Sequence, residues 1–98
     1  MINIIYSERF KVELDEIMRF LKKAVSVEFA YKTFDSILSS IRLLQTFPAI
    51  GRLRACDVDT GREYHLLVTG HYFIYYSYLF EEVRIDGIKD VRNEAYHI

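Results

Sequence analysis

The chain has little cysteine, proline or glycine: one Cys, one Pro and four Gly among 98 residues, and no Trp. A single cysteine, Cys56, cannot form an internal disulfide, and no Cys or His spacing typical of a metal site surrounds it. Hydrophobic residues make up 51% of the chain, which is typical of a folded protein and not of a disordered one. These features predict one globular domain over residues 1–98, without metal or cofactor.

The sequence also lacks a charge excess of either sign, because its formal net charge is −1. Proteins that wrap nucleic acid usually carry a basic excess, so nucleic acid is disfavoured as the main partner, although a local basic patch is compatible with this number. No apolar run approaches the roughly 18 residues that a membrane span needs. The first residues, MINIIYSERFK, lack the charged and long apolar regions of a signal peptide. We therefore expect a cytoplasmic protein.

A first helix is predicted after Ser7, which suits an N-cap and is followed by Glu8, where the helix dipole favours negative charge. Apolar residues then recur with the spacing of one helix face. They are Phe10, Leu14, Ile17, Met18, Leu21 and Val25.

A second helix is predicted after Ser26, and it should end before Pro48, because a residue that precedes proline is disfavoured in the helical region. Its apolar stripe consists of Val27, Ala30, Phe34, Ile37, Leu38, Ile41 and Leu44. The short connection at residues 25–26 predicts that the two helices form an antiparallel hairpin. Each helix can bury its stripe only beneath other apolar elements, and strands are the remaining candidates.

Four strands are predicted, over residues 2–6, 62–68, 71–80 and 83–88, with a loop over residues 49–61. Thr69 with Gly70, and Glu81 with Glu82, are short enough for hairpin turns. The predicted fold is α+β with the order β-α-α-β-β-β, in which the helix hairpin packs on one face of an antiparallel-rich sheet.

The stretch GHYFIYYSYLF, residues 70–80, is apolar on both alternating faces of its predicted strand. Such a strand is central in a sheet, with one face under the helices and the other at least partly covered. We therefore interpret the aromatic residues as core filling and not as a base-stacking platform. One face would carry Tyr72, Ile74, Tyr76, Tyr78 and Phe80, and the other Phe73, Tyr75, Ser77 and Leu79.

Four segments together resemble the RelE/ParE superfamily of toxins from type II toxin–antitoxin modules. YSERFKVELDEIMRFL resembles the family's first helix, LLQTFPAIGR its "L-x-x-x-P-x-x-G-R" pattern, REYHLL with GHYFIYYSY its paired strands, and VRIDGIKDVRNE its last strand. The resemblance covers nearly the whole chain, and it implies the β-α-α-β-β-β fold. It also implies an antitoxin as partner.

The superfamily includes two activities, cleavage of messenger RNA on the ribosome by RelE-like members and poisoning of DNA gyrase by ParE-like members. A metal-independent ribonuclease needs cations beside the phosphate and a group that transfers protons. The positions where RelE-like toxins have these cations correspond here to Tyr64, Leu66, Phe73 and Ser77. The resemblance therefore favours the ParE-like branch, which acts by binding gyrase and is not expected to be an enzyme.

Arginines are the candidate target-binding residues: Arg52, Arg54, Arg62 and Arg92. Arg92 resembles the first arginine of the family's terminal "R-R-D", but the next residues are Asn and Glu. One alternative is a ribosome-dependent endoribonuclease that uses Arg52, Arg62, Arg92, Tyr96 and His97. Another is an inactive toxin fold that still binds the antitoxin. His65 and His71 have no third ligand at a suitable spacing, so no metal site is expected.

An antitoxin segment would bind apolar residues outside the two helix stripes, and the candidates are Val12, Phe20 and Phe29. Exposed apolar surface of this kind usually marks the site of a partner. An acidic antitoxin would also pair with the arginines and so cover the charges that serve toxicity.

Overall fold

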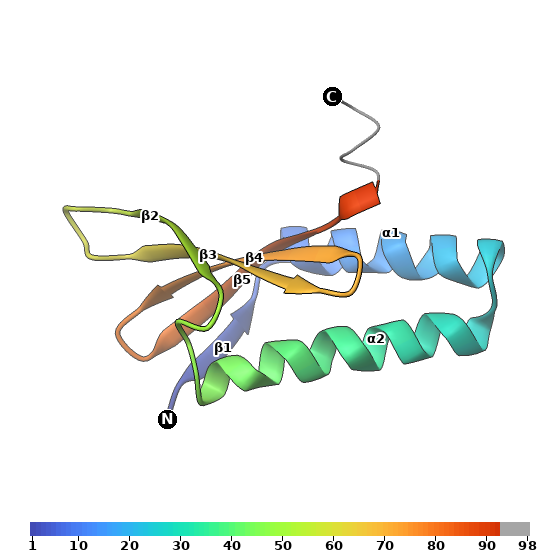
Figure 1. The fold of residues 1–98 in the computed structure, drawn as a ribbon, viewed down its shortest axis with the longest axis horizontal. Coiled ribbons are helices and arrows are strands. Elements are labelled where there is room, and N and C mark those ends of the chain that lie inside the picture. The colour runs from blue at the N-terminus through green and yellow to red at the C-terminus, as the bar shows by residue number, and fades with distance from the viewer. Residues whose placement is uncertain (93–98) are drawn as a thin grey trace.

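A computed structural model describes residues 1–92 of the chain. The described part begins with strand β1 (Asn3–Tyr6), helix α1 (Glu8–Ala24) and helix α2 (Val27–Arg42). A single 3-10 turn, η1 (Leu43–Gln45), leads to four more strands. These are β2 (Arg52–Cys56), β3 (Glu63–Thr69), β4 (Tyr72–Leu79) and β5 (Glu82–Asp90), and Figure 1 shows the sheet with the helix hairpin beside it.

The sheet has five strands in the order β1-β5-β4-β3-β2. β1 pairs in parallel with β5, and the other three neighbouring pairs are antiparallel. The α+β class, the helix hairpin and the antiparallel-rich sheet are therefore confirmed. The loop predicted over residues 49–61 is wrong for Arg52–Cys56, which forms the edge strand β2. The sequence of β2, Arg-Leu-Arg-Ala-Cys, does alternate polar and apolar residues, but the run is short and all five residues are exposed, so its alternation marks no buried face.

Both helices begin at the predicted caps. The hydroxyl of Ser7 accepts a hydrogen bond from the backbone N–H of Phe10, and Ser26 caps α2 in the same way through Phe29. Most of the predicted stripe residues are buried beneath the sheet, and those of α1 are Phe10, Leu14, Met18 and Leu21. Val25 and Val27 are exposed, so their assignment to the stripes is wrong. They lie at the connection between the helices, where no strand covers them.

The aromatic strand β4 occupies the centre of the sheet, between β3 and β5. Tyr72, Ile74 and Tyr76 are buried in the core shared with the helices, which confirms core filling for this face. Phe73 and Tyr75 on the opposite face are only half-buried. One face of β4 is therefore buried in the core, and its opposite face remains partly accessible to solvent.

Phe80 does not belong to the buried face of β4. It lies in the turn between β4 and β5, with a φ of 55° and a side chain that is 83% exposed. A left-handed φ is uncommon for a bulky residue, so its side chain could not be assigned from strand alternation. Both hairpin turns are displaced by one residue from their predicted positions, to residues 70–71 and 80–81.

Candidate functional site

The helices pack on one face of the sheet, and within residues 1–92 no helix covers the other face, here called the open face (Figure 1). Directly paired residues of neighbouring strands share a face. The register pairs Leu66 with Tyr75 and Arg52 with Leu66, so these three residues lie on the same side. Tyr64 and Ser77 form another pair on that side, two residues along each strand. The open face therefore carries both polar and aromatic groups.

Arg62 lies over this face, just before β3 begins. Its Nη1 donates a hydrogen bond of 3.0 Å to the hydroxyl of Ser77, which is fully buried. The hydrogen bond uses one of the five N–H donors of the guanidinium, so the group is oriented but retains donors for another molecule.

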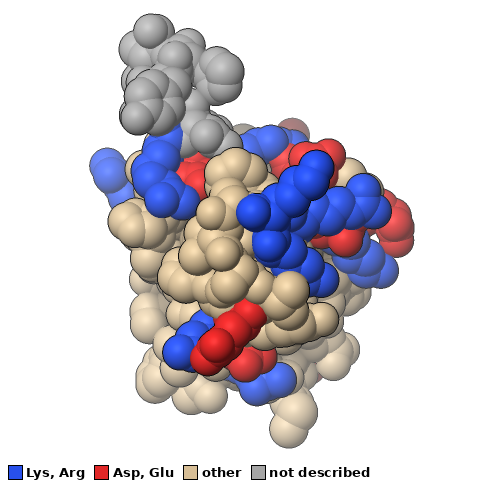
Figure 2. Space-filling view, turned by 90° about the vertical axis from the view of Figure 1, so that its right-hand side faces the viewer, with Lys and Arg blue, Asp and Glu red and all other residues tan. Residues whose placement is uncertain are grey.

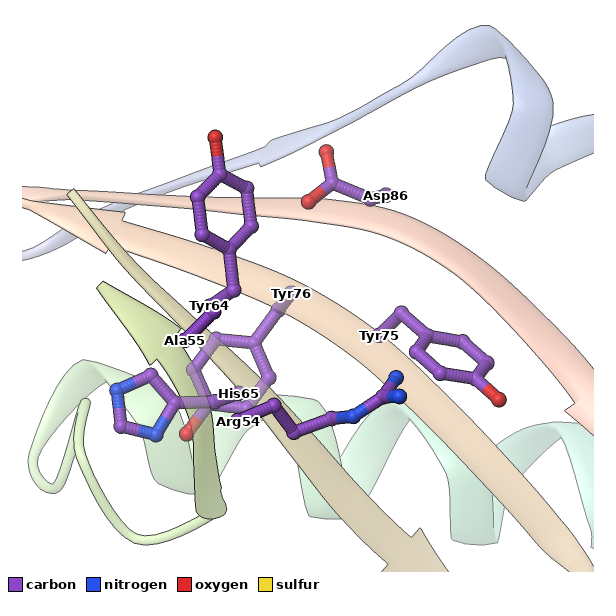
Figure 3. A pocket seen from close by; sticks show the side chains of 7 residues that line it. All are labelled: Arg54, Ala55, Tyr64, His65, Tyr75, Tyr76 and Asp86. Atoms are coloured by element: carbon purple, nitrogen blue, oxygen red, sulfur yellow. The ribbon is translucent and has the colours of Figure 1, made fainter. Parts of the chain in front are cut away.

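Arg54 reaches the same face from the edge strand. Its guanidinium carbon lies 5.4 Å from the centre of the Tyr75 ring, a distance typical of a cation–π contact. Figure 3 shows the Arg54 side chain extended toward Tyr75, within a shallow pocket that Tyr64 and Asp86 also line. The pairing of β2 with β3 shifts register between Leu53 and Ala55, and Arg54 is the extra residue at this irregularity. A bulge of this kind changes the direction in which a side chain projects.

Arg84 adds a fourth cation to the open face, and it was absent from the predicted set. It pairs across the strands with Ser77, and its Nε donates to Asp86 at 2.8 Å. The sequence did contain a signal for this placement, because Arg84 stands between Val83 and Ile85, which are both buried. Alternation along a strand places the middle residue on the face opposite the core.

Arg92 lies elsewhere. It follows β5 and forms an ion pair with Asp90, with Nη2 3.0 Å from one carboxylate oxygen. Burial by itself raises the pKa of Asp90, but the hydrogen bonds from Arg92 outweigh it and lower the pKa of this carboxyl. Arg92 also lines a groove on the helix side of the molecule, together with Tyr72. The structure thus brings together Arg52, Arg54 and Arg62 but not Arg92.

The residues of the ribonuclease alternative are not gathered into one site among the described residues. Arg52 and Arg62 are on the open face and Arg92 is on the other side, whereas Tyr96 and His97 lie outside the described residues. The four positions expected to carry cations in a ribonuclease do project onto the open face, as Tyr64, Leu66, Phe73 and Ser77. Their side chains supply aromatic rings, an alkyl group and a hydroxyl, but no cation.

An apolar groove lies where the helix hairpin meets the turn between β3 and β4. Phe20 and Val25 of the α1 end, and Phe29 of α2, line it, and these side chains are 61%, 57% and 46% exposed. Figure 2 looks at this end of the molecule, and it shows an uncharged surface with Lys and Arg on both sides. Val12 is exposed as predicted, but it does not line the groove.

Within residues 1–92, no group of three or more His, Cys, Asp or Glu is arranged to hold a metal ion. His65 is buried and makes hydrogen bonds inside the fold, while His71 lines the apolar groove. Across the same residues, no helix is long and apolar enough to cross a membrane.

The chain was compared with curated proteins, with solved structures and with protein families. No curated protein matches the chain. The chromosomal ParDE toxin–antitoxin system from P. aeruginosa contains a chain of the same fold, with a TM-score of 0.75 and 19% sequence identity over 93% of this chain and 97% of that one. The family described as ParE toxin of type II toxin-antitoxin system, parDE, matches residues 4–95. The chain therefore belongs to the ParE toxin family of type II toxin–antitoxin systems.

Proposed function

We propose that this ParE-family toxin inhibits growth by binding DNA gyrase through the open face of its sheet, and that a cognate antitoxin neutralises it. The observation that carries the proposal is the concentration of Arg52, Arg54, Arg62 and Arg84 on one face of a protein whose net charge is −1. When a protein with a net charge near zero gathers cations in one place, the local electrostatic potential is positive there although the total charge is not.

The residue types of this face suit protein recognition. Arginine and tyrosine are enriched among the residues that dominate binding energy at interfaces. Arg54 is already held against Tyr75 and Arg62 against Ser77, so less side-chain entropy is lost when a partner binds them. Guanidinium groups bind carboxylates in a bidentate manner, and the gyrase surface is therefore expected to supply Asp or Glu.

Binding is favoured over hydrolysis for the same face. In an enzyme, each well-placed donor or cation stabilises the transition state, typically by about 3–4 kcal/mol. At the positions that correspond by resemblance to the cations of RelE-like ribonucleases, this chain has Tyr64, Leu66, Phe73 and Ser77. The residues of the open face are therefore more typical of a protein–protein interface than of a site that cleaves a phosphodiester.

The antitoxin is proposed to use the apolar groove at the end of the helix hairpin. Phe20, Val25 and Phe29 supply apolar area, and Arg92 lies beside them. An amphipathic antitoxin segment would place its apolar residues on the three side chains and a carboxylate near Arg92. A segment that orders on binding needs a large contact area, so it is expected to continue beyond the groove.

Two assays run in parallel test the target. Purified protein is expected to inhibit gyrase supercoiling and to leave ribosome-bound messenger RNA intact. Arg54→Ala and Arg62→Ala should each weaken the inhibition about tenfold, the effect of losing about 1.4 kcal/mol of binding energy. Arg19→Ala is the matched control, because Arg19 is an exposed arginine on α1 that pairs with Asp15.

The alternatives predict different results. Codon-dependent cleavage of messenger RNA by the wild-type protein would contradict the gyrase proposal and favour the ribonuclease. Binding of the antitoxin without inhibition of gyrase and without cleavage would identify an inactive toxin fold.

A further inference from the structure

The edge strand β2 carries two of the open-face arginines but has no side chain in the core. Each of its five residues is exposed, including Leu53, and β3 is its neighbour in the sheet. Strands with exposed side chains and one neighbour are the parts of a fold that open most easily. Something other than apolar burial must therefore fix the position of Arg52 and Arg54.

A buried polar contact holds the chain immediately before this strand. The backbone N–H of Gly51 donates to the hydroxyl of Tyr76 at 2.9 Å, and the carbonyl oxygen of Gly51 lies 2.9 Å from Nδ1 of His65. A carbonyl oxygen only accepts, so Nδ1 carries the hydrogen in this contact. Both polar backbone groups of Gly51 are thus bound by side chains of the neighbouring strand β3 and the central strand β4. We call this arrangement the Gly51 clamp.

The clamp is rigid because its two side chains are themselves fixed. The rings of His65 and Tyr76 stack with centroids 5.1 Å apart and planes within 9° of parallel. His65 is 3% exposed and Tyr76 1% exposed. Nε2 of His65 also lies 2.8 Å from a carboxylate oxygen of Glu63, which fixes the orientation of the imidazole. Figure 3 shows the two rings side by side next to Arg54.

Gly51 must come close to these groups, and it leaves no space for a side chain. A Cβ at this position would lie 2.7 Å from the Tyr76 hydroxyl and 2.9 Å from the carbonyl oxygen of Leu66. The distances are shorter than real Cβ contacts, so glycine is required by the close approach of the backbone. The glycine of the FPAIGR segment thus anchors the residue that directly precedes Arg52.

We propose that His65 and Tyr76 are positioning residues for target binding, because through Gly51 they fix the strand that presents Arg52 and Arg54. This inference rests on the proposed function, in which those arginines contact the target. A strand held in place before binding loses less conformational entropy in the complex, and the affinity is correspondingly higher. Both side chains are almost completely buried, so their proposed effect on the target is transmitted through β2.

Tyr76→Phe is the most direct test, because it removes the hydroxyl and keeps the ring stacked on His65. Two readouts report β2 itself. One is hydrogen exchange at the amides of residues 52–56, and the other is the mobility of a nitroxide on Cys56, the single cysteine of the chain, which is exposed at the end of β2. Faster exchange, a more mobile label and a gyrase inhibition weakened about tenfold are expected.

Ile88→Val is the matched control. Ile88 lies in the core, and the loss of one methylene lowers global stability without touching Gly51. If Ile88→Val lowers the melting temperature as much as Tyr76→Phe does, it should still leave hydrogen exchange in β2, the mobility of the label and the inhibition of gyrase at wild-type values. His65→Phe, which keeps an aromatic ring but removes the hydrogen bond to Gly51, is the second clamp variant and should behave as Tyr76→Phe does.

The outcomes separate this inference from the proposed function. If both clamp variants leave exchange and label mobility unchanged, or change them no more than Ile88→Val does, the clamp does not fix β2 and the inference is wrong. If β2 becomes mobile but inhibition stays at the wild-type level while Arg54→Ala weakens it about tenfold, the positioning role is also wrong. A wild-type protein that does not inhibit gyrase would overturn the proposed target, and the inference with it, even if the exchange data show that the clamp holds β2.

Discussion

Glu13 of α1 accepts a hydrogen bond of 3.1 Å from the backbone N–H of Ile88, which lies 75 residues away on β5. β1 pairs with β5 only as far as Ile85, so the N–H of Ile88 has no strand beside it on that edge. The same carboxylate forms an ion pair with Lys89. One side chain of the helix thus binds a backbone donor that β1 leaves unpaired at this edge of the sheet.

Glu13→Ala is expected to destabilise the fold by about 1–3 kcal/mol, because a backbone donor in a part-buried contact loses its acceptor and Lys89 loses its partner. Chemical denaturation measured by circular dichroism gives the free energy of unfolding. Glu16→Ala is the control, since Glu16 is exposed on the same helix. Equal stability of the two variants would show that the edge contact contributes nothing.

The same carboxylate predicts a pH dependence. Burial alone raises the pKa of Glu13, but the hydrogen bonds from Lys89 and Ile88 outweigh it, and the pKa lies below its ordinary value. A lowered folded-state pKa means that the stabilisation is complete above the unfolded pKa, about 4.3, and is lost as the pH falls through the folded pKa. Stability measured between pH 7 and 3 should therefore fall less steeply in Glu13→Gln than in the wild type. If the unfolding free energy of the wild type and of Glu13→Gln fell equally steeply with decreasing pH, this role of Glu13 would be contradicted.

Ile74→Ala should cost about 2–5 kcal/mol of unfolding free energy, because Ile74 is fully buried on the central strand and the cavity cannot collapse easily. Val68→Ala on the neighbouring strand β3 is the control. Val68 is 60% exposed, so its truncation should change stability by less than about 0.5 kcal/mol. Thermal melts of the wild type, Ile74→Ala and Val68→Ala measure these differences. If Ile74→Ala melted at the wild-type temperature, the placement of Ile74 in the core would be contradicted.

The proposed antitoxin groove predicts the effect of polar substitutions at its rim. Phe20→Ser and Phe29→Ser should each weaken binding of the cognate antitoxin by about tenfold or more, because apolar area leaves the interface. Isothermal titration calorimetry measures this affinity. Phe80→Ser is the matched control, since Phe80 is also exposed but lies in the turn between β4 and β5. Unchanged affinity in both groove variants would place the antitoxin elsewhere.

The two helices and the central strand could be predicted from the sequence because their signals are local. Ser7 and Ser26 mark helix starts, and the spacing of residues such as Leu14 and Ile37 identifies the face that is buried. The aromatic run of β4 likewise indicated a central strand, since no part of it is polar enough for an exposed one. The order of these elements, with the FPAIGR segment, also carried the family resemblance.

The edge strand and the composition of the open face were decided by tertiary structure. β2 is exposed at every residue, so its short polar and apolar alternation corresponds to no buried face. It forms because β3 offers an unpaired ladder and Gly51 fits against Tyr76 and His65. Register places Arg52 beside Leu66 and brings Arg84 beside Ser77, while the end of β5 directs Arg92 to the helix side. Local sequence determines which residues prefer helix or strand, whereas pairing between distant strands determines which charges share a surface.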